Sequence, residues 1–553
     1  MADDRKALRR RVAEFVESRR AGWLDAHGAV IGITDRQRTL GVIPVGVRDA
    51  FTGEQVTKGT RFEIGSISKS FAAIVALQLV EEGLLDLHAP VTTYVPWFKV
   101  RSTHASITAH HLLTHTSGLI IGMDFADDAL PAAWSLRGTS VGFPPGRHFH
   151  YSNDGYKLLG LVLEVLGDRP WPDMLRARIL EPLRMTHTDP EITFDTAADI
   201  ATPHQREAND RPPHRQRMQV RAPISLSRTA DGSIISTGKD MAIYARMLLH
   251  RGAPPGVRLL SDESFALMTT PHVADTDEEG VAYGYGLDIF EVDGRAHIGH
   301  AGGMVGHYAL LWCDMHVGVA AAMMVNGHAE REPSVRFALD AARAHLVGRP
   351  LPVVTSAPDP LATPLAARLA GDYASADGGT ISLKDHAGRV VATTPDGEVT
   401  LEPLDSVWEA DADAGDEPGR LFAVPIPAMD RFALGVEVDA SGRAIALVHG
   451  PTRYVRAGTT IEPDPVPPTG ASRMTGTYRT WNPWSPGFRV FVRAGRLMLA
   501  RPDGEKLLTR LEGGEWRVGD KWSPDRVRFA TIVNGVAQQA IYNAVPYSRS
   551  FLD

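Results

Sequence analysis

The stretch Phe62-Glu63-Ile64-Gly65-Ser66-Ile67-Ser68-Lys69 places a serine and a lysine three residues apart where an apolar run begins. Residues i and i+3 share one face of a helix, so the Lys69 amine can lie beside the Ser66 hydroxyl. A serine hydroxyl is a good nucleophile only when a neighbouring base takes its proton. The following residues, 71–80, are almost wholly apolar and Gly83 can cap them, which predicts a buried helix. This stretch therefore predicts a nucleophilic serine at the start of a central helix.

Ser-x-x-Lys is too short a pattern to establish this prediction alone, but two later segments support it. Tyr151-Ser152-Asn153 lies 85 residues after Ser66, between a turn and a helical run. His300-Ala301-Gly302-Gly303 lies between two strand-like segments. In this order, the motifs resemble those of the penicillin-recognising serine hydrolases, and most closely their class C β-lactamase branch, where tyrosine opens the second motif. The resemblance covers residues 10–345, including the phrases at 111–119, 235–237 and 284–287.

The resemblance implies a role for each residue of the first two motifs. Ser66 would be the nucleophile, and Lys69 would hold or take its proton. Tyr151, with partial phenolate character beside the cationic amine, would pass a proton to the leaving group and later activate the deacylating water. Asn153 would donate to the substrate amide and help to fix Lys69.

The third motif departs from the usual pattern. By resemblance, the backbone N–H groups of Ser66 and Gly303 would form the oxyanion hole, and Gly302 with Gly303 would let the substrate backbone approach. His300 stands where most β-lactamases and carboxypeptidases carry lysine. Because histidine titrates near neutrality, we expect a partial charge there and a rate that depends on a group titrating at about pH 6 to 7. This weakens the case for a substrate with a free carboxylate.

The bulk composition bounds the class of protein. The 553 residues exceed one ordinary domain, and 43% apolar with 22% charged residues are globular values. The net charge of −8 argues against nucleic acid as an obligatory partner. The single cysteine, Cys313, excludes an internal disulfide and is expected to be buried and inert. The N-terminal residues predict an amphipathic helix without a signal peptide, and no long apolar run occurs, so we expect a cytoplasmic protein with no membrane partner.

Two proline-rich stretches, residues 348–366 and 459–470, are interpreted as linkers. They separate a predicted serine hydrolase domain at residues 1–347 from two segments at 367–458 and 471–553. In the first domain, strands at both ends with helices between them predict an α+β fold, one antiparallel sheet covered by helices.

The two C-terminal segments repeat one another, which indicates an internal duplication. The paired residues are Gly371-Asp372-Tyr373 with Gly476-Thr477-Tyr478, Ala387-Gly388-Arg389 with Ala494-Gly495-Arg496, and Pro395-Asp396-Gly397-Glu398 with Pro502-Asp503-Gly504-Glu505. Each copy alternates polar and apolar residues between glycine turns, which predicts two antiparallel β-barrels of lipocalin-like type. A hydrolase followed by two such barrels resembles the D-aminopeptidases, in which a barrel loop limits substrate size. Barrels that act only as spacers or dimer contacts are the alternative.

Three other patterns are interpreted as having no catalytic role. Gly138-Thr139-Ser140-Val141-Gly142 matches a nucleophile elbow but lacks the required strand and helix around it. The 21 histidines show no metal-ligand spacing, and no phosphate loop or dinucleotide fingerprint occurs, so we expect neither a metal nor a cofactor. The arginine-rich residues 206–221 are interpreted as a solvated insertion near the cleft, with substrate contact as the alternative.

The leading functional prediction is a serine hydrolase that acts through an acyl-enzyme on an amide, as an amidase or peptidase of D-aminopeptidase type. Its partner would be a small-molecule or peptide substrate, and a homodimer is left open. A carboxylesterase, or acyl transfer to an amine including peptide cyclisation, would use the same residues. A penicillin-binding protein that acylates once with poor turnover is a further alternative, and β-lactamase activity would be incidental.

Overall fold

The computed structural model describes residues 2–122, 127–208, 210–276, 278–404, 420–460, 465–485, 487–502 and 504–551. Residues 461–464 of the second predicted linker and Asp503 of the repeated turn lie outside this range. The chain divides into two compact units, called here the first unit (Met1–Gln205 with Arg221–Ala357) and the second unit (Arg206–Val220 with Pro358–Asp553). The predicted division into finer domains and linkers stays a prediction.

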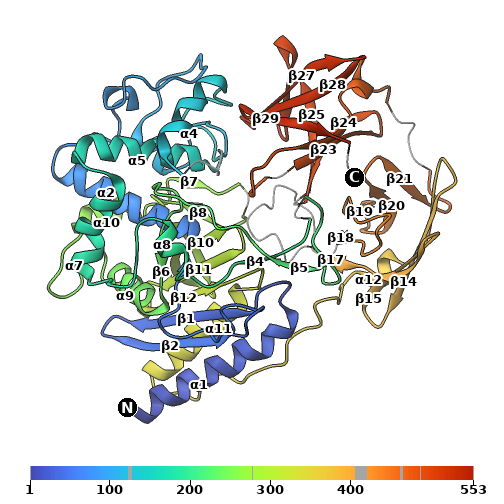
Figure 1. Cartoon of the computed structure of the whole chain (residues 1–553). Helices are drawn as coiled ribbons and strands as arrows, with labels where there is room; N and C mark the ends of the chain where they lie inside the picture. Colours follow the sequence, from blue (N-terminus) through green and yellow to red (C-terminus); the bar gives the residue numbers. More distant parts are fainter. Residues whose placement is uncertain are drawn as a thin grey trace. The chain divides into compact units, whose positions relative to one another are not determined.

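The first unit is built on an eight-stranded antiparallel sheet with the order β2-β1-β12-β11-β10-β9-β8-β7 (Figure 1). Its strands are β1 (Gly28–Asp35), β2 (Thr39–Gly46), β7 (Val273–Ala274), β8 (Ala282–Tyr283), β9 (Asp288–Val292), β10 (Arg295–Met304), β11 (His307–Asp314) and β12 (Val319–Val325). The first strand, β1, pairs with the last, β12, and this joins both ends of the domain in the one antiparallel sheet that was predicted: Ala29 lies opposite Val325, and Asp35 lies opposite Val319.

Helices cover both faces of this sheet. On one side lie α1 (Ala2–Arg19) and α11 (Glu332–Leu346), and on the other lie α2 (Ser68–Glu81) and α9 (Gly238–Leu249). The neighbouring strands β1 and β12 are buried throughout because their alternate residues enter the two layers. Ile31 and Met323 pack with α1 and α11, whereas Val30 and Met324 pack with α2 and α9.

The first unit also contains shorter elements, some of which pack on α2. They are α3 (Ala109–Leu113), α4 (Ala129–Ser135), α5 (Asn153–Gly167), α6 (Trp171–Leu175), α7 (Glu181–Leu183), α8 (Phe194–Ala197), α10 (Asp262–Met268), β3 (Phe62–Glu63) and β6 (Ile235–Ser236). Within α2, residues 68–77 and Leu79 are all buried, which confirms the predicted central helix. The Phe71 ring stacks on the Tyr244 ring with centroids 3.8 Å apart.

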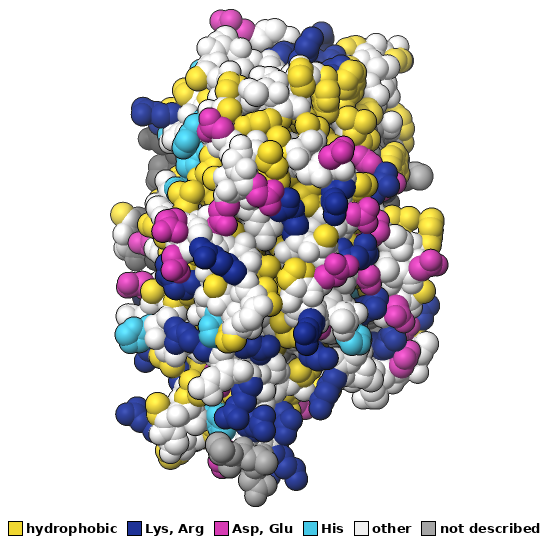
Figure 2. All heavy atoms as spheres, turned by 90° about the vertical axis from the view of Figure 1, so that its left-hand side faces the viewer, with side chains coloured by type: hydrophobic (Ala, Val, Ile, Leu, Met, Phe, Trp, Pro, Cys, Tyr) yellow, Lys and Arg dark blue, Asp and Glu magenta, His cyan; other side chains and the backbone are white. Residues whose placement is uncertain are grey.

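The predicted amphipathic N-terminal helix is present as α1. Leu8, Val12 and Val16 are fully buried, so one stripe of the helix enters the core. Figure 2 shows Lys and Arg side chains gathered at the lower end of the displayed face, where α1 lies, with both signs of charge interspersed above it. Among the described residues, the helices fall short of the length and apolar character that crossing a bilayer requires.

The second unit contains two antiparallel sheets. The first runs in the order β16-β15-β14-β13-β21-β20-β19-β18-β17, and the second closes into a barrel from β22 to β29. The bounds in the first are α12 (Ala366–Leu369), β13 (Gly371–Ser375), β14 (Thr380–His386), β15 (Arg389–Thr394), β16 (Gly397–Thr400), β17 (Glu402–Pro403), β18 (Leu421–Ala423), β19 (Leu434–Val438), β20 (Ala444–His449) and β21 (Thr452–Arg456). Those in the second are β22 (Gly476–Arg479), β23 (Gly487–Arg493), β24 (Arg496–Arg501), β25 (Gly504–Arg510), β26 (Glu515–Val518), β27 (Arg526–Val533), β28 (Val536–Tyr542) and β29 (Val545–Ser550). The predicted fold class, an α+β domain with two antiparallel barrels, is confirmed.

The two barrels repeat one another in geometry as well as in sequence. The buried Tyr373 donates its hydroxyl proton to a carbonyl four residues earlier at 2.6 Å, and Tyr478 does the same at 2.8 Å. The turn residues Ala387 and Ala494 share the left-handed conformation, with φ of 54° and 47°. Because such a φ is uncommon for alanine, the shared conformation supports an internal duplication.

Residues 206–220, here called the 206–220 segment, are part of the second unit. Arg211 and Arg217 both bind Asp430, at 3.0 and 3.1 Å, and Arg215 binds Glu402 at 3.1 Å. The interpretation of these arginines as a solvated insertion is therefore wrong, because carboxylates of the first barrel neutralise them.

The same segment also binds the second barrel, through the buried carboxylate of Asp210. This carboxylate accepts hydrogen bonds from Arg479 at 2.6 Å and Arg489 at 3.1 Å. The Arg489 guanidinium also donates to the Asp210 backbone carbonyl at 2.7 Å. One short segment thus contributes ion pairs to both barrels of the second unit.

Candidate active site

The turn that carries Ser66 lies directly before α2, as a single 3-10 turn over Gly65–Ile67. Gly65 has a φ of +51°, and a Cβ there would lie 2.6 Å from the backbone nitrogen and oxygen of Gly303. Only glycine allows this close approach, so the turn and strand β10 lie against one another. Ser66 keeps intermediate exposure, and the hydroxyl of this predicted nucleophile is therefore within reach of solvent.

The amine of Lys69 lies at the centre of the site. Its Nζ donates to Ser66 Oγ at 2.9 Å, to Asn153 Oδ1 at 2.7 Å and to the backbone carbonyl of Asp231 at 3.0 Å. The side chain is fully buried, and Nζ also lies 4.7 Å from the centre of the Tyr151 ring. Three oxygen acceptors match the three N–H donors of an ammonium group. The structure thus brings the first two predicted motifs together around one cation.

The phenol of Tyr151 is the fourth member of this group. Desolvation raises its pKa well above the usual value, although a side-chain hydrogen bond with Ser66 acts in the opposite direction. The expected partial phenolate is therefore wrong for the free enzyme, in which the phenol is protonated at neutral pH. This outcome follows from the surrounding protein, because the nearby carboxyl of Asp288 also disfavours the phenolate.

The third motif lies on β10. A Cβ on Gly302 would lie 2.0 Å from the carbonyl oxygen of Ile64 and 3.3 Å from the backbone nitrogen of Ser66. Together with the contact between Gly65 and Gly303, this places the two glycines against the Ser66 turn. The structure therefore brings all three predicted motifs to one place.

His300 is buried, with 5% of its surface exposed. Its Nδ1–H donates to the carbonyl of Ala301 at 2.5 Å, so its Nε2 accepts from the Tyr283 hydroxyl at 2.9 Å. Burial, and the Lys69 ammonium nearby, lower the pKa of His300 to about 3. The expectation of a partial charge that titrates near neutrality is wrong, because this imidazole is neutral throughout the physiological range.

Several side chains in the site were not assigned from the sequence. Tyr283, at the end of β8, holds His300, and Asp288, at the start of β9, raises the pKa of Tyr151. Burial raises the pKa of the Asp288 carboxyl itself well above its usual value, and the carboxylates of Glu278 and Asp275 add to this effect. Tyr283 and Asp288 directly flank the stretch Gly284–Leu287 that supports the family resemblance, and this position is the sequence signal that could have identified them.

A second buried lysine supports the first. Lys157 on α5 lies 3.4 Å from Asp154 and 3.7 Å from the carboxylate of Asp231, whose backbone carbonyl binds Lys69. All three side chains are largely buried. Through its ion pair with Asp231, Lys157 helps to fix the residue whose carbonyl binds Lys69. Removing one partner of such a buried pair typically costs about 3–5 kcal/mol.

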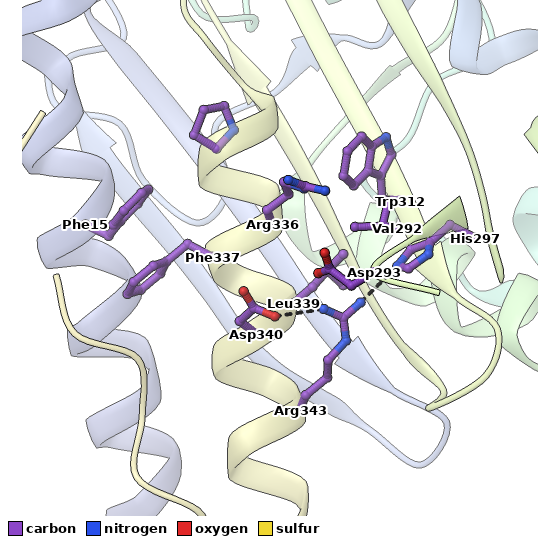
Figure 3. Close-up of a pocket in the computed structure, with 11 residues that line it drawn as sticks. Phe15, Val292, Asp293, His297, Trp312, Arg336, Phe337, Leu339, Asp340 and Arg343 are labelled. Atoms are coloured by element: carbon purple, nitrogen blue, oxygen red, sulfur yellow. Dashed lines mark hydrogen bonds and ion pairs between the residues drawn. The ribbon is translucent and has the colours of Figure 1, made fainter. Parts of the chain in front are cut away.

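A pocket of about 260 Å³ lies elsewhere in the first unit, where α11 packs on β9, β10 and β11 (Figure 3). Figure 3 shows Arg343 reaching from α11 to Asp340 and His297, at 2.8 and 2.9 Å. The residues that line this pocket include none of the three motifs. Within the described part of the chain, no group of three or more His, Cys, Asp or Glu side chains is arranged to hold a metal ion.

Comparison with known proteins gives consistent results. Residues 8–345 match the protein family described as Beta-lactamase. Penicillin-binding protein 4 of Amycolatopsis lactamdurans is 33% identical over 304 residues, which cover 51% of this chain and 76% of that protein.

Two solved structures share the fold. The octameric penicillin-binding protein homologue from Pyrococcus abyssi superimposes with a TM-score of 0.57 at 22% identity, covering 82% of this chain and 99% of that one. D-amino acid amidase from Ochrobactrum anthropi superimposes with a TM-score of 0.51 at 22% identity, covering 61% of this chain and 99% of that one. At this identity the likeness is one of fold alone.

Proposed function

The chain belongs to the Beta-lactamase family of serine hydrolases, and on this premise we propose that it hydrolyses amide bonds through an acyl-enzyme on Ser66, as an amidase or peptidase of D-aminopeptidase type. The family match confirms the resemblance that the three motifs carry. The observation that supports the proposed chemistry most directly is the buried Lys69 amine, 2.9 Å from Ser66 Oγ and held by Asn153.

In the proposed acylation step, Ser66 Oγ attacks the substrate carbonyl, and the Ser66 proton passes to the Tyr151 oxygen as Tyr151 releases its own proton toward the leaving nitrogen. The Lys69 ammonium keeps its three protons and stabilises the negative charge that develops along this relay. The tetrahedral oxyanion would face the backbone N–H groups of Ser66 and Gly303. Tyr151 then protonates the departing amine, which its raised pKa suits because the phenol is protonated at neutral pH. In deacylation, the attacking water gives a proton to the Tyr151 oxygen as Tyr151 passes its own proton to Ser66 Oγ, which leaves as the acyl–oxygen bond breaks.

The charges around the site support an amide without a free carboxylate. Neutral His300 offers no cation where relatives carry lysine. The carboxyl of Asp288 lies close enough to influence Tyr151, and although burial raises its pKa, the ammonium group of a substrate would favour its ionised form and so pair with it. These features favour a substrate with an α-amino group over one with a terminal carboxylate.

A carboxylesterase is the second candidate, and acyl transfer to an amine would use the same acyl-enzyme. Ser66, Tyr151 and Asn153 are only partly buried, which supports these alternatives, since a small acceptor other than water could reach the acyl group. An alkoxide leaving group also requires less protonation by Tyr151 than an amine does.

The test compares steady-state turnover of D-alanine p-nitroanilide and p-nitrophenyl butyrate, with Ser66→Ala as the blank. Cleavage of the D-anilide that is lost in the blank supports the amidase. Turnover of the ester alone moves the assignment to esterase or acyl transfer, whereas one stoichiometric burst without turnover indicates a penicillin-binding protein. Activity that survives in Ser66→Ala refutes the proposed nucleophile.

A further inference from the structure

His115 follows α3 and is fully buried beside the second motif. Its backbone has a φ of +55°, a conformation that costs a residue other than glycine about 1–3 kcal/mol and persists only where the surroundings impose it. The backbone carbonyl of His115 accepts a hydrogen bond from the amide of His150 at 2.8 Å. The residue is therefore held in a strained conformation directly against the chain that leads into Tyr151.

The imidazole of His115 contacts the other side of Tyr151. Its Nδ1 accepts a hydrogen bond from the Ser152 amide at 2.9 Å, so the proton of the neutral ring is on Nε2. The ring also lies on the Tyr151 ring, with centroids 4.1 Å apart and planes inclined by 31°. The backbone amides of His150 and Ser152, on either side of Tyr151, thus both donate to His115, and the His115 ring packs on the phenol ring.

We propose that His115 is a positioning residue, which holds the Tyr151 phenol within reach of Ser66 without touching the substrate. This inference rests on the proposed function, because the position of Tyr151 affects the reaction only if Tyr151 transfers protons. His115 acts through hydrogen bonds and ring contact alone, and its charge plays no part.

The neutral state of the ring agrees with this role. Burial lowers the pKa of His115 well below its usual value, and the nearby Lys69 ammonium has the same effect. A proton on Nδ1 would point a donor at the Ser152 amide, which is also a donor, so protonation would break the contact. The rings of Phe149, Tyr156 and Tyr283 complete the surroundings.

Helix α5 does not depend on this contact. Its N-terminus is capped by Ser152, whose Oγ accepts from the Gly155 amide at 3.0 Å and donates to the Ile120 carbonyl at 2.6 Å. The Asn153 amide is bound separately, by the Ile121 carbonyl at 2.6 Å. Loss of the His115 ring should therefore displace Tyr151 while Asn153 and the helix stay in place.

The test uses three substitutions at one position. In His115→Asn, the side-chain carbonyl takes the place of Nδ1, and asparagine tolerates a positive φ. His115→Gln moves that carbonyl one methylene further out, and His115→Leu removes the acceptor. His297→Leu is the matched control, because His297 is equally buried and also accepts a hydrogen bond at 2.9 Å, from Arg343 in the pocket of Figure 3.

We expect His115→Gln and His115→Leu to lower kcat about 10²-fold with KM changed less than threefold, because a misplacement of about 1 Å has this effect on a reacting group. His115→Asn should recover kcat to within about tenfold of the parent. The limb of the pH–kcat profile that reports Tyr151 should move in the Gln variant and return in the Asn variant. Each variant is measured on whichever of the two chromogenic substrates the enzyme turns over, after circular dichroism has shown that it is folded.

Two results in the His115 variants would overturn the inference. One is a Gln variant with parental kcat and pH profile, and the other is an Asn variant as impaired as the Gln variant. A loss in His297→Leu equal to that in His115→Leu would show a general effect of destabilisation and would also count against it. Failure of the proposed function is distinguishable, because it appears as activity in Ser66→Ala.

Discussion

Replacing Asp210 by asparagine removes the carboxylate through which the 206–220 segment binds the second barrel. Asp210 accepts from Arg479 at 2.6 Å and from Arg489 at 3.1 Å, and the side chains of Asp210 and Arg489 are only 9% and 8% exposed. Burial already lowers the pKa of Arg489, which shows that its charge is poorly solvated. After the substitution, this guanidinium would keep its charge and lose its counter-charge.

The expected cost follows from this burial. Removing one partner of a buried ion pair costs about 3–5 kcal/mol, because the remaining charge is left without compensation. In a unit of about 200 residues, 1 kcal/mol corresponds to about 2–4 °C in Tm, so the second unit should melt roughly 6–20 °C lower. Because asparagine can still accept hydrogen bonds from these arginines, we expect a decrease in Tm toward the lower end of this range.

Differential scanning calorimetry of the full chain, at low and high salt, measures this shift. The control is Asp359→Asn, which breaks an exposed pair of the second unit with Arg389, in which the two side chains are 34% and 43% exposed. An exposed pair is worth at most about 1 kcal/mol. If the second unit has the same Tm in Asp210→Asn as in the Asp359→Asn control, the view that the segment is bound through buried charge is refuted.

Three further predictions concern the first unit. Lys69→Met should lower the acylation rate about 10²–10⁴-fold in a stopped-flow burst, with the exposed Lys239→Met as a control that keeps the parental rate. The pKa of His300 is lowered to about 3, so its contribution to the free energy of unfolding is complete above the unfolded pKa of about 6.5 and is lost as pH falls below that value. Urea unfolding should therefore show a loss of about 2 kcal/mol between pH 7 and 5 that is absent in His300→Gln. An equal loss in both proteins would contradict this. Gly302→Ala should destabilise the first unit by about 1–3 kcal/mol and lower kcat, because its Cβ would lie 2.0 Å from the Ile64 carbonyl, whereas Gly22→Ala, with no atom within 4 Å of its Cβ, should leave both unchanged.

The parts of the site that could be predicted are those set by local spacing or by resemblance. The i, i+3 relation alone places Lys69 beside Ser66, and the structure has these groups in contact. Tyr151 and Asn153 could be placed only by resemblance, because their approach to Ser66 depends on how distant segments fold. The antiparallel sheet and the barrels followed from strand patterns and glycine turns, which are also local signals.

The properties that could not be predicted depend on burial by distant residues. Histidine at position 300 suggests a titrating group, but Tyr283 and the surrounding sheet remove it from water and lower its pKa. The arginines of the 206–220 segment suggest a solvated loop because their counter-charges, Glu402 and Asp430, come about 200 residues later. No local pattern carries this information.

The 206–220 segment also has a consequence for the order in which the protein is made. It leaves the ribosome long before its partners do, since Glu402, Asp430 and Arg489 have yet to be translated. At roughly 5–20 residues per second, the roughly 270 residues between the segment and Arg489 take roughly 15–55 s to synthesise. For that time the Asp210 carboxylate lacks Arg489, and for most of it three arginines (Arg211, Arg215 and Arg217) lack their carboxylate partners. The segment must stay in water until then, which its hydrophilic sequence allows. A synthesis pause placed before residue 489 should therefore lengthen the interval in which this segment is open to proteases.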